Sequence, residues 1–380
     1  MTEQSVTTPP PPPSATPRPR SRWGTAGSAL LVLVVVAVVA ANFVRVPYVL
    51  ISPGDATPLD DTVVSVAGAP THPHDGIFLF LTVQVSTRDP TVWRWLFAKI
   101  DDDISIEKRE NVIGCTSYEQ SAKLNDLLMR ESQDAAKTLA LRRLGYDITE
   151  SSTSVVIRDV ACDSPATDLL LPGDFVRAVD GQPVDEGEQI GTIVRSHRPG
   201  EVVALEVERD GRMQTVRVRT GQVRCSSCVR PCAAVGSSGG SGEACVGILS
   251  EPVVDEVYPF EINIDTRRVS GPSAGLAFAL SIVDDLTTGE LTGGKRVAVT
   301  GEILPDGTVG MVGGVAQKAV AAYESGARLM IVPKGEAKEA RAHANGMRVV
   351  AVDTLDEALE ALERFGGDPI PPGPAESDSQ

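Results

Sequence analysis

The sequence is poor in positive charge and in histidine. Its 380 residues hold 35 Lys and Arg against 51 Asp and Glu, a formal net charge of −16. This balance excludes a general nucleic-acid binder, which needs a basic surface to neutralise phosphates. There are four histidines and no His-Glu-x-x-His motif, so few metal sites or Ser-His pairs can be built. Hydrophobic residues make up 42%, enough for buried cores in the two or three domains that this length predicts.

One stretch near the N-terminus carries no charge at all. Residues 23–44 lack Asp, Glu, Lys and Arg, and 29–41 consists almost entirely of Leu, Val and Ala. A run of this length can cross a hydrocarbon core of about 30 Å. We therefore expect a transmembrane helix at 25–45 after a proline-rich, disordered tail at 1–24. The alternative is a cleaved signal peptide, which has a shorter apolar core and small residues at its cleavage site.

The basic residues on the two sides of this run are unequal. Arg18, Arg20 and Arg22 precede it, whereas after Arg45 the next Lys or Arg is Arg88. Positive flanks stay in the cytoplasm. The sequence thus predicts a single-pass protein of the cell membrane, with a cytoplasmic N-terminus and an extracytoplasmic remainder.

Six cysteines fall in the part predicted to be exported, where thiols oxidise. Four of them share a Ser/Gly-rich loop at 222–245 with the spacing Cys-x2-Cys-x3-Cys-x12-Cys. This spacing allows a four-cysteine zinc site or two disulfides, and export favours disulfides; a third bridge could join the other two. The six are Cys115, Cys162, Cys225, Cys228, Cys232 and Cys245.

The exported part begins with an α/β region at 46–150. A mostly apolar run of β-formers at 76–85 predicts a buried strand. Leucines and alanines recur near helical spacing over 116–144, and Gly145 ends this pattern. We expect the apolar face of this long helix to be packed in a core.

Residues 151–221 predict a small domain of a different kind. Short runs of β-formers alternate with turn signals such as Asp180-Gly181, and one helix is expected at 186–196. This arrangement resembles a PDZ domain and implies a small β-barrel that binds extended peptides as an added strand. The resemblance rests on Ser164-Pro-Ala166, Leu171-Pro-Gly-Asp174 and Val179-Asp-Gly-Gln-Pro-Val184, while Ser152–Val155 stands near the place of the usual Gly-Leu-Gly-Phe loop.

The region at 246–365 alternates strand and helix signals and predicts an α/β domain. A Pro-rich, acidic tail at 366–380 is expected to be disordered. The fold class is therefore multidomain α+β, with one transmembrane helix, a PDZ-like domain and a C-terminal α/β domain. The elements expected in the last are helices at 276–286, 315–325 and 354–365 and strands at 297–300 and 329–332.

Ser273 lies where the tight turn Gly271-Pro-Ser-Ala-Gly275 meets an apolar helix. Backbone N–H groups of a first helical turn lack intrahelical partners and can stabilise an oxyanion. A serine hydroxyl is a weak nucleophile and needs a base. The alternative is that Ser273 merely caps the helix, and a second Gly-x-Ser-x-Gly around Ser238 shows how common that pattern is.

Two residues could serve as the base. His343, oriented by Asp306, would follow the Ser-Asp-His order of α/β-hydrolases, although its surroundings are polar. Lys318 falls about 60° from Val315 on a helical wheel and so lies at the edge of the apolar face. Loss of solvent there would lower the pKa of the amine, whereas a structural lysine would extend its ammonium group into water.

Three motifs occur in order and together resemble the proteolytic domain of Lon peptidases. The resemblance implies Ser273 as nucleophile, Lys318 as general base and Thr300 as a supporting residue that positions the lysine. The whole layout is similar to the secreted YlbL-like proteins of Gram-positive bacteria. The three motifs are Gly271-Pro-Ser-Ala-Gly275, Thr300-Gly-Glu-Ile303 and Gly313-Gly-Val-x-x-Lys318.

The function expected from these features is a membrane-anchored serine endopeptidase that acts on proteins or peptides without a cofactor or metal. Gly289-x4-Gly294-Lys295 nearly matches a phosphate-binding loop, but Arg296 replaces the required Ser or Thr, so we expect no dependence on ATP. His72-Pro-His74 is interpreted as incidental rather than metal-binding. The alternatives are an inactive PDZ-containing surface scaffold and a Ser-His hydrolase. The resemblance to Lon also admits a homo-oligomer.

Overall fold

The computed structural model describes residues 31–370 apart from 34, 37, 115, 224–231, 234–241 and 268. Its main sheet has six strands in the order β19-β18-β15-β3-β1-β4. β15 pairs in parallel with β3 and β18, and β18 with β19, whereas β1 is antiparallel to β3 and β4. The strands are β1 (Tyr48–Pro58), β3 (Ile77–Val85), β4 (Ser105–Lys108), β15 (Arg296–Val299), β18 (Leu329–Pro333) and β19 (Arg348–Val352).

The main sheet joins two regions that the sequence interpretation kept apart. β1, β3 and β4 come from 46–150, whereas β15, β18 and β19 come from 246–365. Arg296 of β15 lies opposite Ile77 of β3. The structure therefore does not keep the predicted division, because the two regions build one sheet and share its cores.

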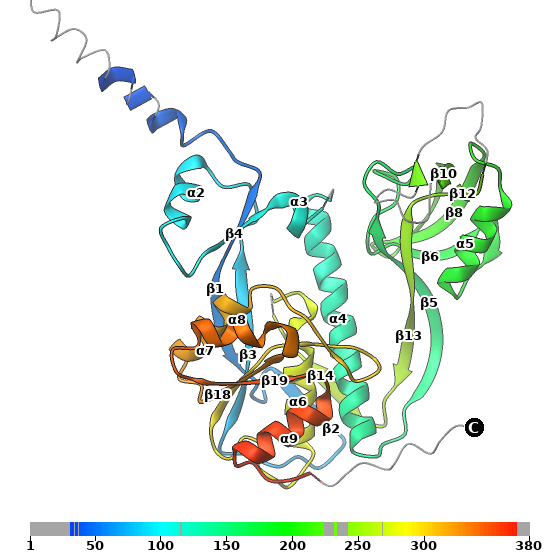
Figure 1. Ribbon diagram of the computed structural model, residues 1–380. Helices are drawn as coiled ribbons and strands as arrows, with labels where there is room; N and C mark the ends of the chain where they lie inside the picture. Colours follow the sequence, from blue (N-terminus) through cyan, green and yellow to red (C-terminus); the bar gives the residue numbers. More distant parts are fainter. Residues whose placement is uncertain are drawn as a thin grey trace, which may run out of the picture.

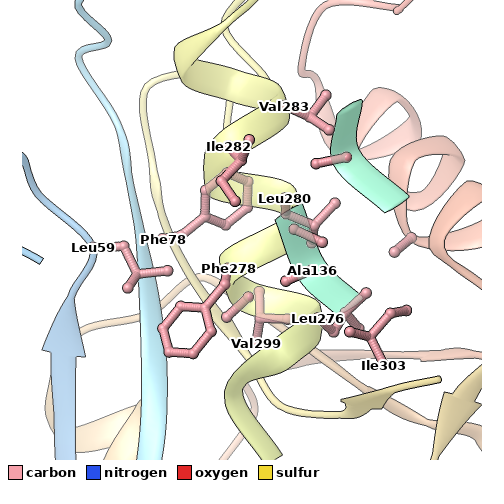
Figure 2. Packing of buried hydrophobic residues seen from close by; sticks show 14 of the residues in the cluster. Leu59, Phe78, Ala136, Leu276, Phe278, Leu280, Ile282, Val283, Val299 and Ile303 are labelled. Carbon is pink, nitrogen blue, oxygen red and sulfur yellow. The ribbon is translucent and has the colours of Figure 1, made fainter. Parts of the chain in front are cut away.

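Helices cover both faces of the main sheet (Figure 1). Side chains alternate along β3, so that Phe78 and Phe80 pack with α6 on one face and Leu79 and Leu81 pack with α7 on the other. Figure 2 shows the first of these cores, around Phe278. Burial on both faces explains why β3 reads as a continuous apolar run. The helices are α4 (Tyr118–Arg143), α6 (Gly275–Asp285) and α9 (Leu355–Phe365) on the first face, and α7 (Val315–Glu324) and α8 (Ala337–His343) on the second.

α4 matches the long helix predicted at 116–144. It begins with a capping box, in which Ser117 Oγ accepts from the Gln120 N–H and Gln120 Oε1 accepts from the Ser117 N–H. The helix packs against α6, and its buried Ser132 donates to the carbonyl oxygen of Pro272 over 2.7 Å. α4 thus supports the turn that precedes α6.

A second sheet, in the order β13-β5-β6-β8-β9 with β7 beside β6, forms a small domain with its own core (Figure 1). Asp210 and Gly211 connect β8 to β9 with φ of 51° and 72°, the left-handed pair that a two-residue hairpin turn requires. The elements are β5 (Thr149–Val160), β6 (Phe175–Val179), β7 (Gln182–Pro183), α5 (Gly187–Ser196), β8 (Val202–Arg209), β9 (Arg212–Arg219) and β13 (Ile248–Val257).

β13 belongs to the small domain by its pairing. It runs antiparallel to β5 from Ile248 opposite Val160 to Val257 opposite Thr149, and Val246 just before it is part of the small core. The predicted boundary at 246 therefore falls inside this domain. β5 and β13 also form the two-stranded connection back to the main sheet (Figure 1).

Short elements complete the described part of the fold. β2 pairs with β14 beside α6, and β16 and β17 form a small hairpin after β15. They are β2 (Val64–Ala67), α2 (Val92–Ala98), α3 (Arg109–Val112), β10 (Gly221–Val223), β11 (Cys232–Ala233), β12 (Ala244–Cys245), β14 (Glu261–Ile264), η1 (Pro272–Ala274), β16 (Glu302–Ile303), β17 (Val309–Gly310) and η2 (Lys334–Glu336).

Cys232 and Cys245 form a disulfide that joins β11 to β12. Cys162 is also disulfide-bonded. For the first pair this agrees with the disulfide alternative and not with a four-cysteine zinc site. Cys115, Cys225 and Cys228 lie outside the described residues.

The N-terminal apolar run is described in part. Residues 31–33, 35–36 and 38–40 are helical and exposed, and Trp93 Nε1 donates to the carbonyl oxygen of Val38 over 2.9 Å. Within the described residues, no helix combines the length and apolar character that a membrane span needs. The tail predicted at 1–24, the first residues of the span predicted at 25–45 and residues 371–380 lie outside the described part of the chain.

Candidate active site

Ser273 lies in η1, a single turn of 3-10 helix that leads directly into α6. Gly271 before it has a φ of 101°, which L side chains rarely adopt, and Pro272 supplies the helical φ at the next position. The Gly271 N–H donates to the carbonyl oxygen of Asn125 in α4 over 3.0 Å. α4 therefore holds the turn at two neighbouring positions, through Asn125 at Gly271 and through Ser132 at Pro272.

Lys318 contacts the hydroxyl of Ser273. Its Nζ donates to Ser273 Oγ over 2.8 Å, and its side chain is 2% exposed. Burial lowers the pKa of the Lys318 amine from 10.5 to about 8, and the nearby carboxylate of Glu336 partly opposes this shift. An amine with such a pKa is in part neutral near pH 8 and can then accept a proton.

Thr300 completes the polar cluster and is fully buried. Its hydroxyl donates to the carbonyl oxygen of Ser273 over 3.2 Å and accepts from Lys318 Nζ over 3.0 Å. Because a threonine hydroxyl has one proton, which is directed at Ser273, its oxygen can only accept from Lys318. Thr300 thereby orients the amine toward Ser273.

The sheet explains how these residues meet. α6 and α7 cover opposite faces, yet Ser273 precedes the first turn of α6 and Lys318 lies in the first turns of α7. The N-terminal ends of α6 and α7 both lie at the carboxyl end of β15, where Thr300 follows the last strand residue. The carboxyl ends of parallel strands are where open α/β sheets commonly place their sites.

Two backbone N–H groups at the start of α6 are already bonded. Gly275 donates to the carbonyl oxygen of Pro272, and Leu276 donates to that of Gly301 over 3.1 Å. Donors for an oxyanion must therefore come from the turn around Ser273 and not from these two amides.

The structure does not place His343 and Asp306 in a hydrogen-bonded triad with Ser273. His343 Nδ1 lies 3.2 Å from the carbonyl oxygen of Glu339 in its own helix, and Asp306 accepts from the backbone and hydroxyl of Thr308. Within the described residues, no hydrogen bond joins either side chain to Ser273.

Comparison with known proteins identifies two domains. The profile of the PDZ domain matches residues 142–220, and that of the Lon protease C-terminal proteolytic domain matches residues 267–364. The chain carries a PDZ domain and a Lon-type proteolytic domain. Ser273, Thr300 and Lys318 all lie within the match to the Lon-type domain.

The curated relatives are much longer than the matched part. The Lon protease of Chloroflexus aurantiacus is 30% identical over 243 residues, which are 57% of this chain and 28% of that protein. Lon protease 2 of Bacillus subtilis is 35% identical over 106 residues, 28% of this chain and 19% of that protein. The chain thus spans less than a third of the length of either relative.

Among solved structures, the PDZ domain of an SdrC-like protein from Listeria innocua is 18% identical, with a TM-score of 0.20. The matched region covers 26% of this chain and 92% of the Listeria chain. The PDZ assignment rests on the profile match and not on this likeness.

The PDZ domain has a feature that its sequence did not indicate. Ser154 and Val155 of β5 lie opposite Val253 and Pro252 of β13, and α5 packs against β12 and β13. The edge of β5 beside the Ser152–Val155 segment is therefore already paired within the chain. An extended peptide cannot be added there unless β13 leaves.

Two residues of the site were missed by sequence reasoning. Glu336 in η2 accepts from the Val312 N–H over 2.8 Å and acts electrostatically on Lys318, while Ser132 holds Pro272. Ser132 lies far from the motifs along the chain and Glu336 lies outside them, and no local pattern distinguishes either residue.

The segment that nearly matches a phosphate-binding loop does not lie after a strand and before a helix, where such loops occur. Residues 289–295 follow α6 and precede β15, whereas such a loop follows a strand and opens a helix. Lys295 Nζ instead lies over the Phe365 ring and donates to the carbonyl oxygen of that residue over 3.4 Å.

Proposed function

We propose that this protein is a serine endopeptidase in which Ser273 is the nucleophile and Lys318 the general base. The single observation that carries the proposal is the 2.8 Å contact between the two side chains, made by a lysine that is 2% exposed. The match of this segment to the Lon-type proteolytic domain supports it.

Under this proposal the reaction passes through an acyl-enzyme. Neutral Lys318 accepts the Ser273 hydroxyl proton as Oγ bonds to the carbonyl carbon of the scissile peptide. Lys318 then gives that proton to the leaving amine, the C–N bond breaks and an acyl-enzyme remains. Water, deprotonated by the same amine, releases the acyl product and restores Ser273. Thr300 keeps the lysine directed at Ser273 in each state.

We propose that the PDZ domain delivers substrate to Ser273. A cleft of about 740 Å³ lies between α4, the PDZ turns at 171–175 and 208–211, and residues 264–267 just before the Ser273 turn. We propose that unfolded chains or peptides enter along this cleft without ATP. Addition of ATP and Mg²⁺ is expected to leave the rate of cleavage unchanged.

The experiment that tests the proposal compares single variants of the purified full chain on an unfolded, fluorescently labelled protein. Ser273→Ala and Lys318→Ala are each expected to lower the cleavage rate roughly 10³-fold or more. Ser238→Ala, in the second Gly-x-Ser-x-Gly pattern, serves as the matched control and should cleave normally. If Lys318→Ala cleaves normally while His343→Ala does not, a Ser-His hydrolase replaces this proposal. If neither Ser273→Ala nor Lys318→Ala changes cleavage, the peptidase proposal is wrong and the scaffold alternative replaces it.

We further propose that residues 25–45 anchor the chain in the cell membrane with both domains outside the cytoplasm. The uncharged run at 23–44 and the arginines before it support this placement. Protease added to intact cells is then expected to degrade the PDZ and Lon-type domains, and removal of 1–45 should release them from the membrane fraction. Protection of both domains in intact cells would contradict the orientation.

A further inference from the structure

A cluster of polar side chains lies at the opposite end of α6 from Ser273. His74 belongs to the segment between β2 and β3, Asp284 to the last turn of α6, and Glu290 to the turn that follows. One ligand atom of each of the three lies within 4.8 Å of the others. α6 has 11 residues, so this cluster is about 16 Å from the first turn of the helix.

His74 carries a nitrogen whose bonding capacity is unused. Its side chain is 9% exposed, and Nε2 is buried without a hydrogen-bond partner in the described part of the chain. Nδ1 lies 3.7 Å from Asp284 Oδ1, which is too long for a hydrogen bond. A buried, unbonded ring nitrogen is costly unless something else occupies that bond.

The charge around His74 is one-sided. Asp284 and Asp285 end α6, where the helix dipole is negative and favours cations, and the last turn holds no basic residue. Asp61 lies close enough to Asp285 to act on it electrostatically, as Glu290 does on Asp284. Across the described residues, no Lys or Arg forms an ion pair with Asp284, Asp285 or Glu290.

The carboxylates retain room for a further ligand. Asp284 Oδ1 accepts from the Leu291 N–H over 2.9 Å. Glu290 is more fully bonded, since its Oε2 accepts from the Asp75 N–H over 2.8 Å and its Oε1 accepts from both the Gly76 N–H and the Thr292 hydroxyl. Each carboxylate oxygen has two lone pairs, so Asp284 keeps most of its accepting capacity, whereas on Glu290 only Oε2 can take a further ligand. Such outer hydrogen bonds are common around metal ligands.

We propose that His74, Asp284 and Glu290 bind one divalent transition-metal ion, with Zn²⁺ as the favoured occupant. One imidazole nitrogen and two carboxylate oxygens suit Zn²⁺ better than Ca²⁺ or Mg²⁺, which prefer oxygen ligands alone. Ligand atoms at about 2.1 Å from a tetrahedral metal are about 3.4 Å apart, so atoms that now lie within 4.8 Å of one another approach by up to about 1.4 Å on binding. The ion would join the segment before β3 to the end of α6 and thereby stiffen the helix whose first turn follows Ser273.

The test uses the oxidised full chain, stripped of metal with a chelator and titrated with ZnCl₂. One equivalent is expected to bind, and saturation should raise the Tm by several degrees, since a ligand at about 100 times its Kd stabilises substantially. His74→Ala and Asp284→Asn are each expected to weaken binding at least about ten-fold. His72→Ala, two residues away and outside the cluster, is the matched control and should bind as the wild type does.

Several outcomes would overturn the site. They are no binding, equal binding by His74→Ala, or Ca²⁺ and Mg²⁺ raising the Tm as much as Zn²⁺. Circular dichroism of the metal-free variants checks folding, and if His74→Ala does not fold, Asp284→Asn decides, since its carbonyl oxygen can still accept from the Leu291 N–H. Cobalt substituted for zinc should give visible absorption bands that are lost in the same variants. Ser273→Ala should retain the metal, so failure of the site and failure of the proposed peptidase are distinguishable.

Discussion

Lys318 is in an environment that its side chain ordinarily avoids. Its ammonium group lies among apolar residues of α7 with two hydroxyl partners, and no carboxylate forms an ion pair with it among the described residues. A buried amine without a paired charge costs stability, since the charged form loses its hydration. Under the proposed mechanism the same burial serves catalysis, because a base must be able to lose its proton near neutral pH.

The first prediction concerns the pH dependence of cleavage. Burial lowers the pKa of Lys318 to about 8, and the neutral amine is the active form, so kcat/KM should rise with pH and reach half its maximum near pH 8. A continuous assay from pH 6 to 10 measures this. A midpoint near 6.5 would instead indicate an imidazole base.

The second prediction concerns stability. Lys318→Met should abolish cleavage yet raise the Tm at pH 7, because it removes the penalty of burying the amine. The folded pKa of about 8 lies below the unfolded value of 10.5, so unfolding takes up protons between them. The penalty is full below pH 8 and disappears toward pH 10.5. The gain in Tm should therefore shrink over this range in calorimetric scans, and a gain that grows with pH would contradict the assignment.

At the scale of the element, α7 depends on the glycine that precedes it. Gly314 has a φ of 67°, and a Cβ there would lie 2.8 Å from Val83 Cγ1, whereas a Cβ on Gly313 meets nothing within 4 Å. Gly314 also accepts the Lys318 N–H at its carbonyl oxygen. The glycine thus sets both the start of the helix and the position of the lysine.

The third prediction compares these two neighbours. Gly314→Ala is expected to lower the free energy of unfolding by about 1–3 kcal/mol and to reduce cleavage, because it strains the backbone and displaces α7. Gly313→Ala, the matched control, should change either quantity little. Denaturant unfolding and the cleavage assay measure both variants, and equal effects would argue against a specific role for Gly314.

The fourth prediction concerns β13, which occupies the edge of β5. Peptides with free C-termini should bind the intact chain weakly, since an added strand must first displace ten residues of β13. Hydrogen exchange should show slow amides throughout β5 and β13. Tight binding of a peptide with these amides still protected would show that the ligand uses another surface.

At the scale of the whole molecule, the hydrophobic cores are separate. The cores on the two faces of the main sheet include residues from 56 to 370, whereas the PDZ core draws on residues between 155 and 248. Domains with their own cores commonly unfold in separate steps.

The fifth prediction follows from this separation. Calorimetry should resolve two transitions, and replacing Cys232 and Cys245 by Ser should lower the PDZ transition alone, by about 2–4 kcal/mol of PDZ stability. The disulfide lies next to Val246 of the PDZ core, which is why the effect should be confined. A shift of both transitions would show that the domains unfold together.

The sequence by itself determined the local elements, and its resemblance to a known family indicated the candidate dyad. Helix and strand periods are properties of short segments, so α4, α6, α7 and β3 were predicted close to their observed bounds. The resemblance of three motifs to the Lon proteolytic domain selected Ser273, Thr300 and Lys318, whereas the residues taken alone left His343 and Lys318 as alternative bases.

Only the tertiary structure decided which distant segments meet. The pairing of β3 with β15, the position of β13 on β5, the approach of Glu336 to Lys318 and the cluster around His74 leave no periodic trace in the chain. Such contacts are selected by burial and packing over the whole fold, where many strand pairings suit the same local pattern. That is why His74, interpreted as incidental from the sequence, gained its neighbours only when α6 and the turn after it were placed beside it.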